Sequence, residues 1–143
     1  MRTEDIERSQ EYFTSTVALV TAKNGEVTNV MSAEWSLRVS LDPFLMAVFV
    51  GYERGTYDLI RESGEYGLSY CSDQQGKKTG QNIEGVFWSV AGGKEYFEGR
   101  VIDEFKVGDH AAFIGEVLTA YYDDSNPSPR TLTAIFSFSR KRL

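Results

Sequence analysis

Cysteine and histidine are almost absent from this chain, and their scarcity excludes several kinds of protein. The 143 residues include one cysteine, Cys71, and one histidine, His110. A single cysteine cannot form an internal disulfide, so the chain is not a small secreted scaffold held by disulfides. With one histidine and no C-x-x-C pair, the usual ligands of a zinc site are missing, and no metal site is predicted.

Positive charge and long apolar runs are also scarce. The formal net charge is -6, which disfavours nucleic-acid binding because phosphate neutralisation requires an excess of lysine and arginine. The longest apolar run, residues 44–50, is far too short to cross a bilayer. The first residues, MRTEDIERSQEYF, are charged and lack the apolar stretch of a signal peptide. We therefore expect a cytoplasmic protein with no membrane and no nucleic-acid partner.

The motifs of several common enzyme classes are missing as well. The chain has no G-x-G-x-x-G after a strand-like run, no phosphate loop ending in Gly-Lys-Ser/Thr and no G-x-S-x-G. A Ser-His-Asp triad would have to use His110, and no nucleophile elbow accompanies it. Hydrolase chemistry is therefore disfavoured.

What the chain does contain is strand-forming sequence. Its content of 41% hydrophobic and 13% aromatic residues suits a single globular domain over residues 1–143. Asn24-Gly25 separates two β-rich runs and predicts a tight hairpin. The apolar run at residues 44–50, bounded by Pro43 and Gly51, predicts a strand covered on both faces.

Helical signals are few. Thr56 is predicted to be the N-cap of a helix that ends at Gly64, and weaker signals favour short helices at residues 4–13 and just after residue 72. Many strands around one well-marked helix predict a mainly β fold, a closed antiparallel barrel of Greek-key type with a few short helices at its edge. The remaining strand-like runs cover residues 66–71, 96–105, 111–122 and 130–139.

The first of three segments that suit a ligand site is NVMSAEW, residues 29–35. It places short amide and hydroxyl side chains beside Met31 and Trp35, which a plain core strand does not need. The segment is either an irregular pair of edge strands, or a binding surface whose backbone and small polar groups hold a flat ligand with polar edges.

The other two segments carry a cation and the imidazole. ERGTY, residues 53–57, brings Arg54 to the start of the predicted helix, where free N–H groups and the helix dipole favour an anion. The alternative there is an ordinary capped helix. GDHAAFIGEV, residues 108–117, presents His110 after a Gly-Asp turn, and Gly115 allows something to approach the backbone closely.

In this order and spacing, the three segments resemble those of the flavin reductase-like proteins, which have an FMN-binding split β-barrel fold. The resemblance covers residues 17–71 and 97–117, about half of the chain. It implies a homodimer with one FMN per site near the subunit interface, with FAD as the alternative cofactor and NAD(P)H as the electron donor.

The resemblance also implies roles for individual residues. His110, beside the flavin face on which a nicotinamide stacks, is the implied catalytic residue. From residue type alone, Trp35 is more often a core or interface aromatic, but it lies within the implied site. The implied cofactor-binding residues are Asn29, Val30, Met31, Ser32, Ala33 and Trp35 in the first segment, Ser40 in the next strand, Arg54, Thr56 and Tyr57 on the phosphate side, and Gln75, Lys78 and Thr79 in a later loop.

The implied function is that of an FMN-dependent oxidoreductase, which takes electrons from NAD(P)H and passes them to flavin, ferric iron or another acceptor. The chain departs from the family pattern in a reduced segment at residues 80–95 and in Glu34, where a small or hydroxyl residue is commoner. The reduced segment keeps open a second hypothesis, an FMN-binding electron carrier or sensor without a nicotinamide site. A split barrel that has lost flavin and serves as an interaction module is the third.

Overall fold

The computed structural model describes residues 17–71 and 93–122. The helices predicted at residues 4–13 and after residue 72, and the strand predicted at residues 130–139, lie outside the described residues. Within them, no helix is long and apolar enough to span a membrane.

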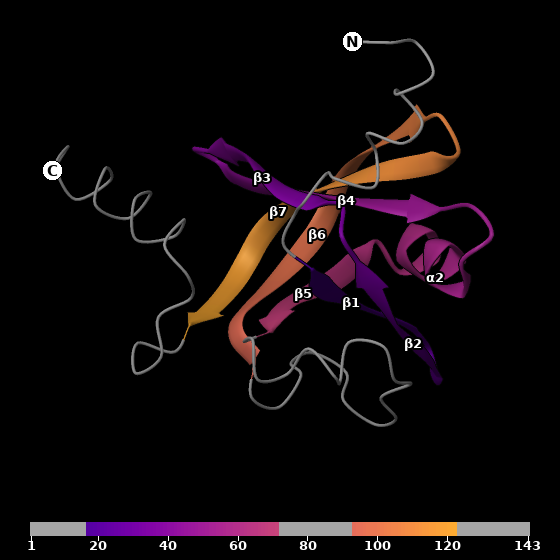
Figure 1. Cartoon of the computed structure of the whole chain (residues 1–143), viewed down its shortest axis with the longest axis horizontal. Coiled ribbons are helices and arrows are strands. Elements are labelled where there is room, and N and C mark those ends of the chain that lie inside the picture. The colour runs from indigo at the N-terminus through magenta and orange to yellow at the C-terminus, as the bar shows by residue number, and fades with distance from the viewer. Residues whose placement is uncertain (1–16, 72–92, 123–143) are drawn as a thin grey trace, which may run out of the picture.

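The described residues form a seven-stranded sheet and one helix (Figure 1). Every strand pair is antiparallel, in the order β2-β1-β5-β6-β7-β4-β3. The mainly β fold is therefore confirmed. Closure into a barrel stays a prediction, because β2 and β3 are the two edges of the sheet in the part of the chain described. The elements are β1 (Ala18–Asn24), β2 (Val27–Ala33), β3 (Ser36–Leu41), β4 (Phe44–Gly51), α2 (Gly55–Ser63), β5 (Glu65–Cys71), β6 (Gly93–Val107) and β7 (His110–Tyr122).

Two tight turns connect the strands of the β1–β2 and β6–β7 hairpins. Asn24 pairs with Val27 across the predicted β1–β2 turn, where Gly25 has a φ of 57°. Val107 pairs with His110 across the β6–β7 turn, where Gly108 has a φ of 60°. Glycine adopts positive φ without the steric cost of a Cβ, so both turns are encoded locally.

The structure corrects the predicted start of the helix and confirms its end. The N-cap of α2 is Arg54, not Thr56. Thr56 lies fully buried in the first turn, and its hydroxyl accepts a hydrogen bond from the side chain of Asn29 instead of capping the helix. Gly64 ends α2 with a φ of 72°, and its N–H donates to a carbonyl in the last turn.

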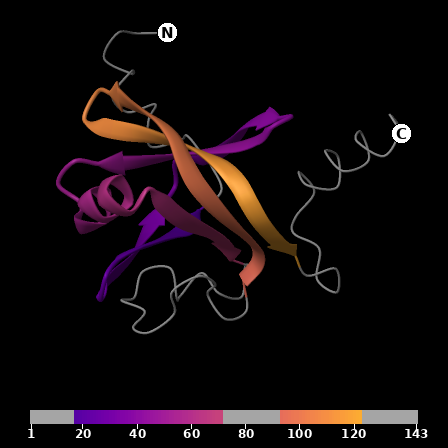
Figure 2. The same cartoon turned by 180° about the vertical axis from the view of Figure 1, so that it is seen from behind.

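The sheet bends around one apolar core, and α2 packs mainly on β1 and β2. The view from behind shows the long β6–β7 hairpin crossing the molecule from one end to the other (Figure 2). The helix contributes Leu59 and Ile60 to this core. The strands contribute the buried side chains of Ala18, Val20, Ala22, Ala33, Met46, Val48, Val50, Tyr66, Leu68, Ala111 and Phe113.

Tyr66 passes through the core beside two glycines. Its hydroxyl donates to the carbonyl oxygen of Met46 at 2.8 Å. A Cβ at Gly115 would lie 2.5 Å from the Tyr66 hydroxyl oxygen, and a Cβ at Gly99 would lie 3.0 Å from the ring. The close approach predicted at Gly115 is thus confirmed, and the group that approaches is a core tyrosine.

We expect the free energy of unfolding to fall above about pH 10, in part through Tyr66. Burial, with a smaller contribution from Tyr70, raises the pKa of Tyr66 far above its ordinary value. The unfolded phenol therefore loses its proton first, and between the two pKa values the unfolded state binds fewer protons. Stability that is fully present below the unfolded pKa is then lost as pH rises, by up to about 1.4 kcal/mol per pH unit for each such group.

Urea denaturation of the wild type and Tyr66→Phe, from about pH 8 to about pH 11, checks this expectation. The variant loses the hydrogen bond to Met46, which costs about 1 kcal/mol at neutral pH. It should then lose stability less steeply with rising pH than the wild type. Parallel pH dependences would show that Tyr66 does not contribute.

Candidate functional site

The segments singled out in the sequence meet at the end of β4. Gly51, the last residue of β4, pairs with His110, the first residue of β7. The carbonyl oxygen of Gly51 accepts the N–H of Arg54 at 3.0 Å, which closes the turn into α2. The carbonyl oxygen of Trp35 accepts the N–H of Phe49, also at 3.0 Å. The tertiary structure therefore gathers Trp35, Arg54 and His110 around one end of a buried strand.

Asn29 joins β2 to the start of α2. Its side-chain amide nitrogen donates to the hydroxyl of Thr56 at 3.1 Å, and its side-chain oxygen accepts the N–H of Val30 at 2.9 Å. A Cβ at Gly55 would lie 3.2 Å from the same amide nitrogen, so the backbone of the helix start lies close under Asn29. The first and second segments thus contact each other directly.

The five predicted β2 residues divide between two faces of the sheet. Asn29, Met31 and Ala33 pair with buried residues of β1 that belong to the core. Val30 and Ser32 point to the opposite face, because side chains alternate along a strand. A single flat ligand can therefore meet the side chains of only one set. As an edge strand within the described residues, β2 also offers outward N–H and C=O groups along its free side.

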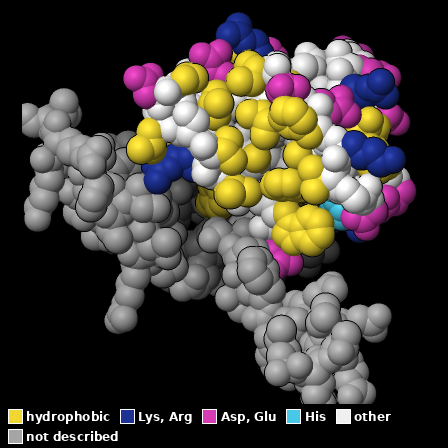
Figure 3. Space-filling view, turned by 90° about the horizontal axis from the view of Figure 1, so that it is seen from above, with side chains coloured by type: hydrophobic (Ala, Val, Ile, Leu, Met, Phe, Trp, Pro, Cys, Tyr) yellow, Lys and Arg dark blue, Asp and Glu magenta, His cyan; other side chains and the backbone are white. Residues whose placement is uncertain are grey.

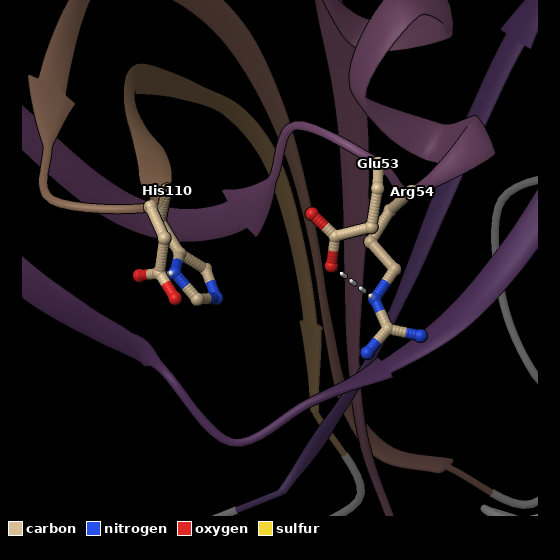
Figure 4. A network of polar contacts seen from close by, with 4 residues as sticks. Glu53, Arg54 and His110 are labelled. Atoms are coloured by element: carbon tan, nitrogen blue, oxygen red, sulfur yellow. Dashed lines mark hydrogen bonds and ion pairs between the residues drawn. The ribbon is translucent and has the colours of Figure 1, made fainter.

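The start of α2 has the groups that an anion needs. Its N-cap makes no side-chain hydrogen bond, so the side chain of Arg54 caps none of the first N–H groups, although the Arg54 carbonyl oxygen accepts the N–H of Tyr57 at 2.9 Å. Arg54 stands there with its side chain 63% exposed, and its Nε lies 3.5 Å from a carboxylate oxygen of Glu53. Figure 4 shows the Glu53 carboxylate between Arg54 and His110. The guanidinium that an anion needs is present, and in the free protein the Glu53 carboxylate is its ion-pair partner.

Tyr57 is turned away from this anion site. Its hydroxyl donates to Glu104 of β6 at 3.1 Å, and its ring packs against Tyr52 and Phe113. Partial loss of solvent, followed by the Glu104 carboxylate, raises the pKa of Tyr57. Its predicted contact on the phosphate side stays a prediction, and its hydroxyl already has a partner elsewhere.

His110 lies between a carboxylate and an aromatic ring. Its Nδ1 is 2.6 Å from a side-chain oxygen of Asp109, and its ring centroid is 4.5 Å from that of Trp35, with the planes tilted by 44°. The hydrogen bond to His110 is the first cause that lowers the pKa of Asp109. The carboxylate of Asp109 and the ring of Trp35 thus contact the imidazole from two sides.

Sequence reasoning missed three carboxylates that contact predicted site residues. Glu53 and Asp109 each stand directly before their partners, Arg54 and His110, and this adjacency was the available signal. Glu104 contacts Tyr57 from 47 residues away, and nothing local to either residue indicates that pairing. Glu34, noted as unusual, is exposed at the link between β2 and β3.

The remaining predicted site residues do not lie with Trp35, Arg54 and His110 at the end of β4. Ser40 pairs with Leu45, near the opposite end of β4 from Gly51, which places it about 20 Å along the strand. Gln75, Lys78 and Thr79 lie outside the described residues. In residues 17–71 and 93–122, no group of three or more side chains is arranged to hold a metal ion.

An apolar face of the sheet borders His110, and Figure 3 shows apolar side chains gathered on one side of the molecule. Residues that pair directly across two strands point to the same face of the sheet. Val107 pairs with His110, so the apolar face reaches His110 at this end. Leu37, Phe105 and Val107 remain 48%, 51% and 47% exposed, so a large part of the surface faces solvent. We define the apolar face as Leu37, Ala47, Phe49, Phe105, Val107, Ala112 and Ile114.

The sequence matches the family model of the Flavin reductase like domain over residues 10–141. This chain belongs to that family. An uncharacterized protein of Archaeoglobus fulgidus is 31% identical to it, with 70% of this chain and 68% of the relative covered. Membership in the flavin reductase-like family supports a flavin-related oxidoreductase function.

Solved structures share the flavin reductase-like fold. The NADH:FAD oxidoreductase SgcE6 of Streptomyces globisporus C-1027, in complex with NAD and FAD fragments, has a TM-score of 0.76 at 22% identity, with 89% of each chain covered. An FMN-binding protein from Thermus thermophilus with bound p-hydroxybenzaldehyde has a TM-score of 0.70 at 21% identity. That comparison covers 79% of this chain and 74% of the other. These likenesses establish the fold of this flavin reductase-like chain.

Proposed function

We propose that this protein binds FMN and acts in the cytoplasm as an oxidoreductase, taking electrons from NAD(P)H and passing them to flavin, ferric iron or another acceptor. The observation that carries the proposal is the meeting of β2 with the uncapped start of α2, beside Arg54 and His110. The names of the two structural neighbours, an NADH:FAD oxidoreductase and an FMN-binding protein, support it. The proposal includes the closed split barrel predicted from the sequence.

The start of α2 fits the phosphate of FMN. The N–H groups of its first turn and the positive end of the helix dipole favour a dianion. The guanidinium of Arg54 adds a charge-assisted hydrogen bond once it turns from Glu53 to the phosphate. Asp58 in the first turn and the Glu53 carboxylate beside Arg54 oppose this binding mildly. The groups that favour a phosphate at this helix start therefore outnumber those that oppose it.

The ring and the ribityl chain fit along β2. In the proposed arrangement, the outward N–H and C=O groups of this edge strand bind the polar edge of the ring, so the backbone carries much of the contact. Asn29 orients the junction between ring and phosphate sites through its bond to Thr56. When bound, the flavin supplies hydride acceptance and onward electron transfer, while the protein supplies binding and orientation. In the proposed arrangement FAD binds in the same way, with its adenylate extending beyond the start of α2.

A homodimer is part of the proposal. The apolar face borders His110 and leaves three large side chains about half exposed, and an apolar patch of this kind is typical of an interface. A second copy of the chain would cover it and exclude water from one side of the ligand site. The site would then lie near the subunit interface.

Leu37→Glu is expected to convert the dimer to monomer at micromolar concentration. Each copy buries one unpaired carboxylate at a cost of at least about 2 kcal/mol, so a two-fold dimer loses at least about 4 kcal/mol, or roughly 900-fold in its Kd. Sedimentation equilibrium measures the change. Val27→Glu is the matched control, because Val27 is 62% exposed on β2 and lies outside the apolar face. A monomeric wild type, or a Leu37→Glu protein that dimerises as tightly as the wild type, would contradict the proposed interface.

The function is tested with purified protein loaded with FMN and mixed, without oxygen, with NADH or NADPH. Bleaching of the flavin absorbance by either donor supports the oxidoreductase. Reduction by dithionite but by neither nucleotide would identify an electron carrier or sensor instead. Protein that is colourless and binds no added FMN would overturn flavin binding altogether and leave an interaction module.

A further inference from the structure

The link between β2 and β3 is a sharp corner that keeps these two strands apart. Antiparallel strands joined by two residues usually pair as a hairpin, but β2 and β3 are the two edges of the sheet in the described residues. The N–H of Ser36 donates to the carbonyl oxygen of Glu34 at 3.2 Å, which makes a three-residue turn. The carbonyl oxygen of Trp35 then accepts the N–H of Phe49 at 3.0 Å, so the chain turns from β2 toward β4.

A tyrosine on β5 bonds to this corner from the face of the sheet that carries the core. Ser36 pairs with Val48 of the core, so its side chain points to that face. Its hydroxyl oxygen lies 3.0 Å from the hydroxyl oxygen of Tyr70, a hydrogen bond between partly buried groups in which either can donate. Because β5 and β3 are not neighbours in the sheet, the bond ties an edge strand to a central strand.

Two small residues leave room for this contact. Tyr70 pairs with Ala18, and Ala18 pairs with Ala33 at the end of β2, so the three side chains form one row on the core face. Ala18 and Ala33 are both buried. Two strand spacings, about 10 Å, separate Tyr70 from Ala33. A phenol that extends along this row over two methyl groups reaches the corner, and a longer side chain at either alanine would obstruct it.

We propose that Tyr70 and Ser36 are positioning residues, which hold the corner so that the outward edge of β2 stays open to the ring of the flavin. This inference rests on the proposed FMN-binding function. If the corner relaxed, β3 would fold back on β2 as a hairpin and pair with the same N–H and C=O groups that the ring requires. The Tyr70–Ser36 bond opposes that rearrangement, because it fixes the start of β3 to β5. Neither side chain touches the ligand in this arrangement.

The first test measures hydrogen exchange by NMR in flavin-free protein. The amide of Phe49 reports the corner, because it donates to Trp35. Tyr70→Phe should raise the exchange rate of this amide by about 3- to 10-fold, the value of one hydrogen bond, relative to amides at the centre of the β6–β7 ladder. An equal change at Phe49 and in that ladder would show only general destabilisation and would overturn the positioning.

Tyr96→Phe is the matched control. It also removes one tyrosine hydroxyl bond, which Tyr96 donates to Glu98 at 3.1 Å. Tyr96 pairs with Ser69, the residue before Tyr70 on β5, so its side chain points to the face opposite Tyr70. The control should leave the exchange rate of the Phe49 amide, relative to the same ladder, within about twofold of the wild type. A rise as large as that in Tyr70→Phe would count against a specific role of Tyr70.

The second test compares the binding of FMN and riboflavin, followed by quenching of flavin fluorescence. Tyr70→Phe should raise both Kd values by about 3- to 10-fold, because the corner acts on the ring, which the two ligands share. Arg54→Ala, in contrast, should weaken FMN alone. Tyr96→Phe should keep both Kd values within about twofold of the wild type. Unchanged Kd values in Tyr70→Phe, or a loss confined to FMN, would overturn the inference.

A double mutant assigns the effect to the bond itself. In a Ser36→Ala background the bond is already lost, so Tyr70→Phe should add less than about twofold to the riboflavin Kd. Losses that multiply in full would show that the two hydroxyls act separately, which contradicts the inference. If the wild type binds neither FMN nor riboflavin, the proposed function fails, and the exchange rates in flavin-free protein still decide whether Tyr70 holds the corner.

Discussion

Gly115→Ala is expected to lower the free energy of unfolding by about 2–4 kcal/mol, combining an overpacking cost of about 1–3 kcal/mol with a lost hydrogen bond of about 1 kcal/mol. The added Cβ would lie 2.5 Å from the Tyr66 hydroxyl oxygen and 2.8 Å from ring carbons. Tyr66 is fully buried and donates to Met46, so it cannot move without breaking that bond. For a chain of this size, such a loss lowers Tm by roughly 10 °C.

A double-mutant cycle identifies the cause of this destabilisation. Tyr66→Leu removes the hydroxyl and the ring edge that meet the new methyl group, so Gly115→Ala should cost less in a Tyr66→Leu background than in the wild type. We expect a coupling of at least about 1 kcal/mol from urea denaturation. Additive losses, or a Gly115→Ala protein as stable as the wild type, would show that the glycine is not required by Tyr66.

Arg54→Ala is expected to weaken FMN binding by about 1.5–3 kcal/mol, or roughly 10- to 150-fold in Kd, the value of a charge-assisted hydrogen bond. Arg54 is the guanidinium at the start of α2, and its partner in the free protein is the exposed Glu53. Titration followed by quenching of flavin fluorescence measures the loss. Riboflavin, which lacks the phosphate, should bind the variant and the wild type equally well.

Arg61→Ala is the matched control for charge. Arg61 lies in the last turn of the same helix, and its side chain is 63% exposed, as is that of Arg54. Its removal lowers the net charge equally but takes no cation from the helix start, so FMN affinity should remain within about twofold. Equal losses for both variants would indicate a general electrostatic effect. A loss shared by riboflavin would place Arg54 beside the ring instead of the phosphate.

Glu53→Gln tests whether Glu53 competes with the proposed phosphate for Arg54. The glutamate lies 3.5 Å from the Arg54 guanidinium in the free protein, so FMN bound as proposed would have to displace it. An exposed pair of this kind contributes at most about 1 kcal/mol. The variant should therefore bind FMN up to about fivefold more tightly, and a weaker complex would assign Glu53 a direct role in binding the ligand.

Much of the fold was predictable because its signals are local. Asn24-Gly25 predicted a hairpin that forms with Gly25 at positive φ, and Gly64 predicted the end of α2. The apolar run at residues 44–50 predicted β4, which lies between two strands of the sheet. Each feature depends on the conformational preference of one or two residues, or on a continuous run, and so is visible without a partner.

The start of α2 shows where local signals fail. Threonine is a good N-cap residue, and this favoured Thr56 over Arg54. Thr56 is instead fully buried, and its hydroxyl accepts a hydrogen bond from Asn29 on β2. That contact spans 27 residues. A hydrogen bond to a distant residue therefore takes the place of the N-cap that the local preference had predicted for Thr56.

The sequence by itself determined which segments are proposed to form the ligand site: the polar strand around Asn29, the cation Arg54 before a helix, and the imidazole His110 after a Gly-Asp turn. Only the tertiary structure decided that these segments meet at one end of β4, that Tyr57 turns to Glu104, and that Trp35 packs against His110. The physical reason is that turns and caps follow from the preferences of adjacent residues. Strand order and register follow from many weak contacts between distant residues, and no short stretch of sequence contains them.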